Sequence, residues 1–236
     1  MAHLYYWPVK LAAWLGGVAF VASLGYVAYF YVVVLGSAAG TADQLLRSGL
    51  VDTALFTGFA LHHSLFARTS LKAIVSRWVS PANERSVYVW VSSILLFAVC
   101  IFWQSVPGLI YRAEGVLRLA LFGLQVVGMA LTARGASVID PLELAGIRQA
   151  STRASHDTLR VAGPFRVVRH PIYLGWMLMV FGAPTMTANR LLFAVLSSLY
   201  LILAIPWEER SLVAAHGDRY RAYQQQVRWR VLPGIW

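Results

Sequence analysis

The chain has 236 residues, of which 58% are hydrophobic and only 13% are charged, against roughly 25% charged in an average soluble domain. A water-soluble fold of this length could not cover its surface with so few charges. The composition therefore excludes a soluble protein and indicates one embedded in lipid. The formal net charge of +10 is compatible with nucleic-acid binding, and the positions of the basic residues decide whether that class applies.

The first predicted element is a membrane span over Leu11–Leu35, which holds no charged side chain in 25 residues. That length exceeds the roughly 20 residues needed to cross the hydrocarbon core of a bilayer. The run is too long for the core of a signal peptide and lacks a clear small-residue cleavage site, so we expect it to be retained. Further spans are predicted, in chain order, at residues 50–66, 86–102 and 115–133.

Two shorter apolar stretches follow at residues 172–187 and 191–207, joined by Ala188-Asn189-Arg190. At about 1.5 Å per residue each is slightly short for a full crossing, which indicates either a hairpin or a locally thinned bilayer. The sequence therefore predicts five or six transmembrane helices. Because lipid does not tolerate an open sheet edge, the expected fold is an all-α, polytopic integral membrane protein.

We expect one domain over residues 1–236. Residues 1–133 would supply four N-terminal spans, and residues 134–236 a polar region with a C-terminal helical hairpin and tail. The sequence shows no internal repeat, low-complexity tract or linker that would divide it further. Cys100 is the one cysteine and lies in a predicted span, so no disulfide framework or cysteine-based metal site is expected.

The basic residues follow the positive-inside pattern of membrane proteins. With the N-terminus inside and six spans, 16 of the 20 lysines and arginines fall on the cytoplasmic side. Such a bias orients a membrane protein and can hold anionic lipid headgroups. We therefore expect membrane lipids as partners and no nucleic acid.

The same topology brings separated polar residues to one membrane face. His62 and His63, Arg148, Arg169-His170 and Glu208-Glu209 would all lie near the cytoplasmic surface. Ionisable residues at membrane depth are costly and usually functional. The simplest purpose that they could share is a pocket at the inner leaflet.

The segment from Arg169 to Gly175 is typical of a helix start. Pro171 suits the first helical turn, where its missing N–H would be unpaired anyway. Exposed N–H groups there favour a carboxylate, and Gly175 would let a ligand or a neighbouring helix approach. The alternative is an ordinary helix cap, with Arg169 and Tyr173 reaching the lipid headgroups.

Glu208 and Glu209 are adjacent acids in a chain that has few, and they close the last apolar stretch. One could accept hydrogen bonds from a ligand ammonium or ribose hydroxyl, while the other pairs with an arginine. The alternative is a solvated helix C-terminus paired with Arg210 or Arg219, where carboxylates are slightly unfavourable.

His62 and His63 are consecutive, and consecutive helical residues point about 100° apart. They cannot both serve one metal in ordinary geometry, and no third histidine or cysteine stands at a matching spacing, so no metal site is expected. One of them could act as a base in a pocket, or the pair could be structural.

Four motifs in register resemble those of the isoprenylcysteine carboxyl methyltransferase superfamily, which includes phospholipid N-methyltransferases. They are Gly163–Arg166, Arg169–Gly175, Glu208–Leu212 and Gly217–Tyr223. Further segments, at residues 63–68, 84–88, 142–149 and 183–187, are similar to those of bacterial methanethiol S-methyltransferases, and this resemblance is nearly full length. It implies a multi-pass protein of the bacterial inner membrane with a cytoplasmic-facing cofactor pocket in the C-terminal third.

The resemblance also implies S-adenosylmethionine as the cofactor. Phe165 replaces the tyrosine of the isoprenylcysteine enzymes and keeps an aromatic face. Those enzymes also carry an arginine for the substrate carboxylate shortly before the glutamates, whereas residues 199–207 contain no basic residue here. The cofactor-binding residues implied are Gln149, Asp157, Thr158, Leu159, Arg160, Phe165, His170, Pro171, Tyr173, Gly175 and one of Glu208 and Glu209.

A small thiol such as methanethiol would not need that arginine, and its methylation would give dimethyl sulfide. A thiolate is a much better nucleophile than a thiol, so the reaction needs a base and a stabilising cation. We predict His63 as the base and Arg148 as the cation, which would hold the thiolate or the cofactor carboxylate.

Three alternatives remain open at the level of sequence. The acceptor could be a lipid or a prenylcysteine. The chain could be a non-catalytic membrane protein of the kind linked to nitric oxide metabolism, which shares part of the resemblance. A sterol-type reductase has a related helical fold, but no Gly-x-Gly-x-x-Gly signature for a nicotinamide cofactor is present.

Overall fold

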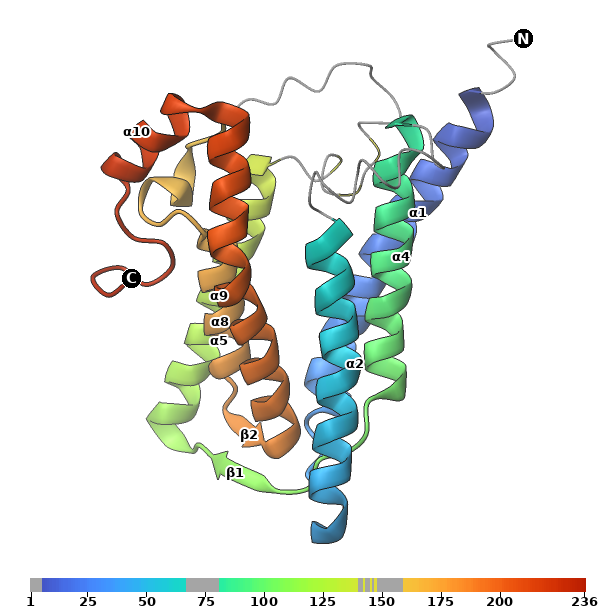
Figure 1. Ribbon diagram of the computed structural model, residues 1–236. Coiled ribbons are helices and arrows are strands. Elements are labelled where there is room, and N and C mark those ends of the chain that lie inside the picture. The colour runs from blue at the N-terminus through green and yellow to red at the C-terminus, as the bar shows by residue number, and fades with distance from the viewer. Residues whose placement is uncertain (1–5, 67–80, 140–141, 143–144, 146, 148–158) are drawn as a thin grey trace. The chain divides into compact units, whose positions relative to one another are not determined.

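A computed structural model describes residues 6–66, 81–139, 142, 145, 147 and 159–236 of the chain. Most of these residues are helical (Figure 1). Four of the described helical segments are long and apolar enough to cross a membrane: Lys10–Val34, Glu84–Phe102, Gly115–Ile139 and Ala188–His216. The prediction of a multi-pass helical membrane protein is therefore confirmed. The predicted total of five or six crossings stays a prediction.

The described residues fall into two compact units. The first contains α1 (Tyr6–Tyr29), which continues as a π-helical turn at Phe30–Val34, together with α2 (Leu45–Phe66) and α4 (Pro81–Phe102). In this unit α1 packs along α4, where the Trp90 indole N–H donates to the Ala12 carbonyl at 3.0 Å. Helix α2 runs antiparallel to α4. Its Asp52 is fully buried and accepts from the backbone N–H of Gln104 at 2.8 Å, just beyond the end of α4.

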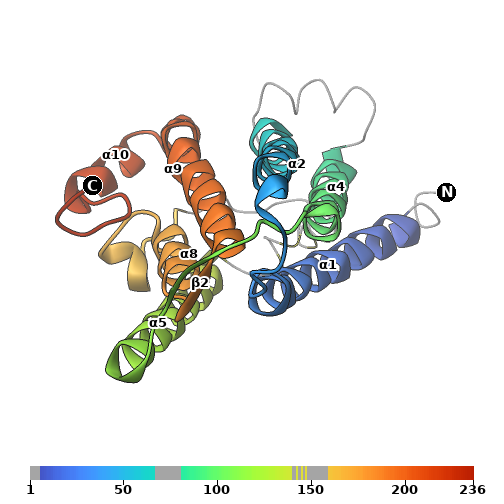
Figure 2. The same ribbon diagram turned by 90° about the horizontal axis from the view of Figure 1, so that it is seen from below.

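The second unit is built on α5 (Gly115–Ile139), α8 (Pro171–Phe181) and α9 (Ala188–His216) (Figures 1 and 2). The 3₁₀ helix η3 (Gly163–Arg166) and α10 (Asp218–Gln226) complete it. Helix α5, expected to group with the N-terminal spans, here packs on α8. The expectation of a single domain over the whole chain stays a prediction.

A close helix crossing joins α5 to α8. A Cβ atom added at Gly175 would lie 2.7 Å from the Gly128 carbonyl oxygen and 2.8 Å from the Thr132 backbone nitrogen, and one added at Gly135 would meet the Ile172 side chain at 2.6 Å. Small residues at helix interfaces let backbones approach closely in membranes, where packing rather than water exclusion drives association. Of the two uses expected for Gly175, the structure shows the contact with a neighbouring helix.

The strictly all-α expectation is wrong in one place. Strands β1 (Leu109–Arg112) and β2 (Thr185–Thr187) form a two-stranded antiparallel sheet with an irregularity between Leu109 and Tyr111. Both strands belong to connections, β1 before α5 and β2 between α8 and α9. A paired ladder there satisfies backbone groups that no helix satisfies. The joint of the predicted helical hairpin is thus at residues 182–187, and Ala188-Asn189-Arg190 already belongs to α9.

At the start of α9, Asn189 holds two neighbouring chain segments by hydrogen bonds. Its side chain is buried, accepts from the Val106 backbone N–H at 2.8 Å and donates to the Ser37 carbonyl at 3.1 Å. Beside it, the Thr187 hydroxyl donates to the Leu35 carbonyl and accepts from the first turn of α9, which makes Thr187 the N-cap of that helix. The start of α8 and the acids Glu208 and Glu209 of α9 lie at the opposite ends of these two helices.

Candidate functional site

Helix α8 begins beside the C-terminal tail of the chain. Pro171 occupies its first turn, as predicted, and His170 is the N-cap residue. The backbone N–H groups of Arg169 and His170 donate to the carbonyls of Trp229 and Arg230 at 2.9 and 2.8 Å. The tail therefore runs along the entry to α8 and fixes where the two side chains before the helix point.

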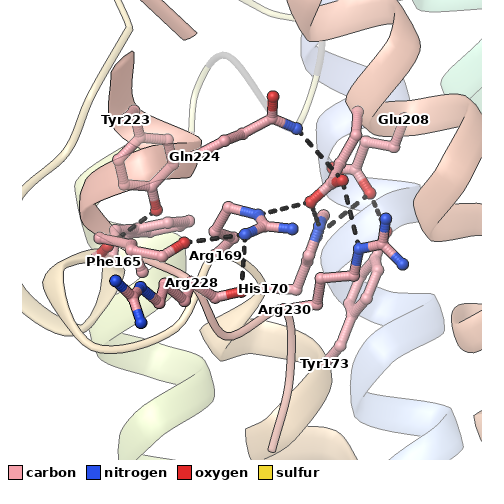
Figure 3. A network of polar contacts seen from close by, with 11 residues as sticks. Phe165, Arg169, His170, Tyr173, Glu208, Tyr223, Gln224, Arg228 and Arg230 are labelled. Carbon is pink, nitrogen blue, oxygen red and sulfur yellow. Dashed lines mark hydrogen bonds and ion pairs between the residues drawn. The ribbon is translucent and has the colours of Figure 1, made fainter. Parts of the chain in front are cut away.

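Glu209 is the buried centre of a charged network (Figure 3). Its Oε1 accepts from Arg169 Nε at 2.6 Å and lies 3.3 Å from His170 Nε2. Its Oε2 accepts from Gln224 Nε2 at 3.3 Å and lies 3.4 Å from Arg230 Nε. A buried carboxylate is tolerated when it is paired and hydrogen-bonded in this way. Glu209 thus has the arginine partner expected for one acid of the pair.

Arg169 joins helix α9 to the tail. While its Nε contacts Glu209, its Nη1 donates to the carbonyls of Val227 and Arg228 at 2.8 and 2.9 Å (Figure 3). The planar guanidinium presents its donors in a fixed fork, so one side chain can hold two chain segments at a defined angle. With its side chain only 7% exposed, Arg169 is a positioning residue of the network and is closed to a ligand.

Glu208 differs from its neighbour in being accessible. Its side chain is 43% exposed, against 6% for that of Glu209. The Tyr173 hydroxyl donates to Glu208 Oε2 at 2.6 Å, and His170 Nδ1 lies 3.6 Å from the same oxygen. The rings of His170 and Tyr173 stack with centroids 5.2 Å apart, so the two partners of Glu208 brace each other. The result is an oriented carboxylate that solvent can reach.

The alternative that placed both acids at a helix C-terminus is wrong. Helix α9 continues beyond both acids to His216. The arginines that pair with Glu209 are Arg169 and Arg230, whereas the alternative named Arg210 or Arg219. The macrodipole penalty for carboxylates at a C-terminus therefore does not apply, because that effect falls off within the last turn.

Tyr220 and Tyr223 of α10 are two buried tyrosines that lie between the charged network and η3. Burial raises the pKa of both phenols, with Glu209 adding to the rise and Arg169 opposing it. Both hydroxyls therefore stay protonated, and that of Tyr223 donates to the Phe165 carbonyl at 2.7 Å (Figure 3). This bond ties η3, with the predicted aromatic residue Phe165, to α10.

Two other predicted cofactor residues are engaged in structural contacts. Arg160 Nη1 donates to the carbonyls of Val138 and Ile139 at 3.0 and 2.6 Å, which caps the end of α5. Leu159 packs against the buried cluster of Tyr220, Tyr223 and Val227. The predicted residues Arg148, Gln149, Asp157 and Thr158 lie outside the described part of the chain.

His62 and His63 belong to the first unit, at the end of α2, and both contact Tyr88 of α4. The Tyr88 hydroxyl lies 2.9 Å from His63 Nδ1, and the Tyr88 ring stacks on that of His62 with centroids 5.9 Å apart. Within the described residues, no group of three histidine, cysteine or acidic side chains could hold a metal ion. The hydroxyl of Tyr88 thus holds the side chain of His63, the predicted base.

The structure adds residues that the motifs alone did not single out as site residues. Gln224 and Arg230 contact Glu209 from the C-terminal region, and Arg169 is its closest partner. Arg169 was among the polar residues expected at the same membrane face as the glutamates, and one acid of the pair was expected to bind an arginine. Nothing in the local sequence marks Arg230.

Comparison with known proteins identifies a matching family and several relatives. The phospholipid methyltransferase family matches residues 124–219, which include His170, Tyr173 and both glutamates. Methanethiol S-methyltransferase 2 of Bradyrhizobium diazoefficiens is 33% identical over 96% of this chain and 88% of its own length. The methanethiol S-methyltransferase of Mycobacterium tuberculosis is 35% identical over 75% of each chain, and that of Crocosphaera subtropica 32% identical over 78% of this chain and 75% of its own.

Proposed function

Because the chain belongs to the family of membrane methyltransferases that includes the methanethiol S-methyltransferases, we propose that it methylates a small thiol such as methanethiol. The methyl donor would be S-adenosylmethionine, and the product a thioether such as dimethyl sulfide. The observation that carries the proposal is the exposed, oriented carboxylate of Glu208 beside the buried network of Glu209, within the region that the family shares.

The residues present fit such a donor. Glu208 offers one accessible carboxylate, held by Tyr173 and His170, and a carboxylate of this kind suits an ammonium or ribose hydroxyl. When bound, the donor supplies a methyl group on a positively charged sulfur. Phe165 would offer an aromatic face to the donor, while Gln149, Asp157 and Thr158 stay predictions for further contacts. Arg169, Gln224 and Arg230 keep the cluster in place through Glu209.

A small apolar thiol is the acceptor that the chain favours. Such a molecule partitions into lipid, so a site on a membrane protein collects it and keeps bulk water away from the reacting sulfur. The absence of a basic residue over 199–207 favours an acceptor without a carboxylate. His63 and Arg148 stay predictions for the base and the stabilising cation. The distribution of basic residues supports an inner-membrane protein whose site faces the cytoplasm.

The second candidate acceptor is a lipid, because the matching family is described as phospholipid methyltransferase. Purified protein in nanodiscs, given methyl-labelled S-adenosylmethionine, separates the two when methanethiol, phosphatidylethanolamine and a prenylcysteine are supplied in turn. We expect label in volatile dimethyl sulfide, measured in the headspace, and none in the lipid or prenylcysteine fractions. Label in lipid alone would overturn the thiol assignment, and no transfer to any acceptor would overturn the proposed function.

The matched control for this assay is Asp218→Asn. Asp218 pairs with Arg221 on the surface of α10, with side chains 96% and 61% exposed. Exposed pairs of this kind contribute little, so the variant should transfer methyl groups at the rate of the parent protein.

A further inference from the structure

Two arginines contact Glu209, and they differ in accessibility. The Arg169 side chain is 7% exposed and lies 2.6 Å from Glu209 Oε1, so it neutralises that buried carboxylate. The Arg230 side chain is 34% exposed, and its Nε lies 3.4 Å from the other oxygen, Oε2, which also accepts from Gln224. The buried carboxylate is therefore balanced without Arg230, whose positive charge lies where solvent can reach it.

The Arg230 side chain is held in place although it is accessible. Its backbone N–H donates to the Trp236 carbonyl at 2.9 Å, and its own carbonyl accepts from the His170 N–H at 2.8 Å. Its guanidinium carbon lies 5.3 Å from the centroid of the Trp236 ring. Within the described residues, its two Nη groups have no hydrogen-bond partner. A guanidinium held in this way presents a fixed fork of N–H donors, which suits a carboxylate.

Glu208 supplies the opposite charge beside it. Its carboxylate is 43% exposed and is oriented by Tyr173 and His170. In Figure 3 the Glu208 carboxylate and the Arg230 guanidinium lie on the same side of the Glu209 carboxylate. Among the described residues no ion pair joins Glu208 to Arg230, so neither charge neutralises the other.

Two accessible and opposite charges that do not pair with each other match a ligand that carries one ammonium and one carboxylate. A carboxylate alone would select a cation, and a guanidinium alone would select an anion. An α-amino acid carries both groups on one carbon atom, and the amino-acid end of S-adenosylmethionine is of this kind. The chemistry of Glu208 and Arg230 together thus indicates a zwitterion.

We propose that Arg230 binds the α-carboxylate of the methyl donor while Glu208 binds its α-ammonium, an assignment that rests on the proposed function. Both roles are in binding, and neither residue takes part in a covalent step. Trp236 is a positioning residue that acts through Arg230. Of the two roles predicted for Arg148, the one that remains for it is to stabilise the thiolate.

The role of Arg230 is tested with two ligands that differ only in the carboxylate. Isothermal titration calorimetry on protein in nanodiscs measures the affinity of S-adenosylhomocysteine and of its decarboxylated analogue, 5′-deoxy-5′-(3-aminopropylthio)adenosine. The parent protein should bind S-adenosylhomocysteine roughly 10- to 150-fold more tightly than the analogue. Arg230→Gln should lose that factor for S-adenosylhomocysteine and bind the analogue as the parent protein does. An equal loss for both ligands would mean that Arg230 only positions the tail, and would overturn its binding role.

The role of Glu208 is tested with a third ligand, 5′-deoxy-5′-(3-carboxypropylthio)adenosine, which keeps the carboxylate and lacks the ammonium. Glu208→Gln should weaken the binding of S-adenosylhomocysteine and leave that of this ligand unchanged. Arg230→Gln should weaken both, because both carry the carboxylate. If Glu208→Gln weakens both ligands equally, the pairing of Glu208 with the ammonium is wrong.

The matched control is Arg228→Gln, on the same tail. Arg228 is exposed, and in Figure 3 its guanidinium points away from Glu208. The substitution keeps the backbone carbonyl that Arg169 contacts, so all three ligands should bind as they do to the parent protein. Arg230→Lys keeps the charge but not the fork, and its affinity for S-adenosylhomocysteine should lie between those of the parent protein and Arg230→Gln. If Arg230→Gln does not fold, Arg230→Lys decides the matter, because only S-adenosylhomocysteine should bind it more weakly than the parent protein.

The same titrations separate this assignment from the proposed function. If the parent protein binds neither S-adenosylmethionine nor S-adenosylhomocysteine, both fail. If it binds them and Arg230→Gln weakens the two ligands of the first comparison equally, the binding role of Arg230 alone fails. Phosphoethanolamine carries the phosphate and ammonium of a lipid headgroup and should not displace S-adenosylhomocysteine. Displacement would assign Glu208 and Arg230 to a lipid headgroup and would overturn the assignment to the donor.

Discussion

Glu208 and Glu209 are adjacent and chemically identical, yet the structure predicts opposite consequences for their replacement by glutamine. Glutamine keeps the size and one carbonyl oxygen of the side chain and removes only the charge and one acceptor. The side chains are 43% and 6% exposed respectively, so the same perturbation acts once at the surface and once in the interior.

Glu209→Gln should destabilise the protein. The Arg169 guanidinium, 7% exposed and 2.6 Å from Glu209 Oε1, would lose its countercharge while staying buried. Breaking a buried ion pair from one side costs about 3–5 kcal/mol. For a chain of this size 1 kcal/mol corresponds to roughly 2–4 °C, so we expect the melting temperature to fall by roughly 6–20 °C.

Glu208→Gln should leave stability nearly unchanged, because the Tyr173 hydroxyl can still donate to the amide oxygen and an exposed charge contributes about 0–1 kcal/mol. Its effect should be on the donor. A hydrogen bond to a charged group is worth about 1.5–3 kcal/mol, which corresponds to a loss of affinity for S-adenosylmethionine of roughly 10- to 150-fold.

Differential scanning fluorimetry of both variants in one detergent, with and without S-adenosylhomocysteine, measures the two effects together. A ligand at 100 times its dissociation constant stabilises the native state by about 2.7 kcal/mol. The parent protein should show this stabilisation, and at the same ligand concentration Glu208→Gln should keep only about 0.3–1.4 kcal/mol of it, because its dissociation constant is roughly 10- to 150-fold higher. If Glu209→Gln melts with the parent protein, or if Glu208→Gln melts as low as Glu209→Gln, the division of roles between the two acids is wrong.

Three further substitutions test the surrounding structure. Gly175→Ala should lower the free energy of unfolding by about 1–3 kcal/mol or more, because the added Cβ would meet backbone atoms of α5. Its control is Gly123→Ala, whose added Cβ would have no atom within 4 Å, and which should have the melting temperature of the parent protein in the same scan. Asn189→Leu should lower the melting temperature as well, since the Val106 backbone N–H that it leaves buried and unpaired costs about 1–3 kcal/mol. Arg169→Lys cannot reproduce the guanidinium fork, so the amide hydrogen exchange of residues 227–230 should become roughly tenfold faster or more. The control Arg221→Lys changes an exposed ion pair and should leave this exchange rate unchanged.

The spans were predictable because length and apolarity are local properties of the sequence. Runs such as Leu11–Leu35 are recognisable without knowledge of their neighbours. The two-stranded sheet was not predictable in this way, because β1 and β2 are separated by about 70 residues and gain their backbone bonds only from each other. Its three to four residues per strand also fall below the length at which alternation identifies a strand.

The site was predictable in its composition but not in its division of labour. The sequence indicated that His170, Tyr173 and the two glutamates would meet, and the contacts confirm that they do. It did not indicate which glutamate would be buried. Adjacent helical residues point about 100° apart, and the face that is covered depends on Arg169 before α8 and on the tail after α10. Those partners come from segments that no local pattern connects.

The position of the acids along α9 explains why so dense a charge network is tolerated in an apolar chain. About 20 residues of α9 precede Glu208, and at about 1.5 Å per residue they span about 30 Å, the thickness of the hydrocarbon core. The contacts of His170 and Tyr173 place the start of α8 at the same level. At that boundary water reaches Glu208 while protein covers Glu209. The burial of one acid and the exposure of the other thus follow from the same depth, and under the proposed function a water-soluble cationic donor and an apolar thiol dissolved in lipid would meet at this level.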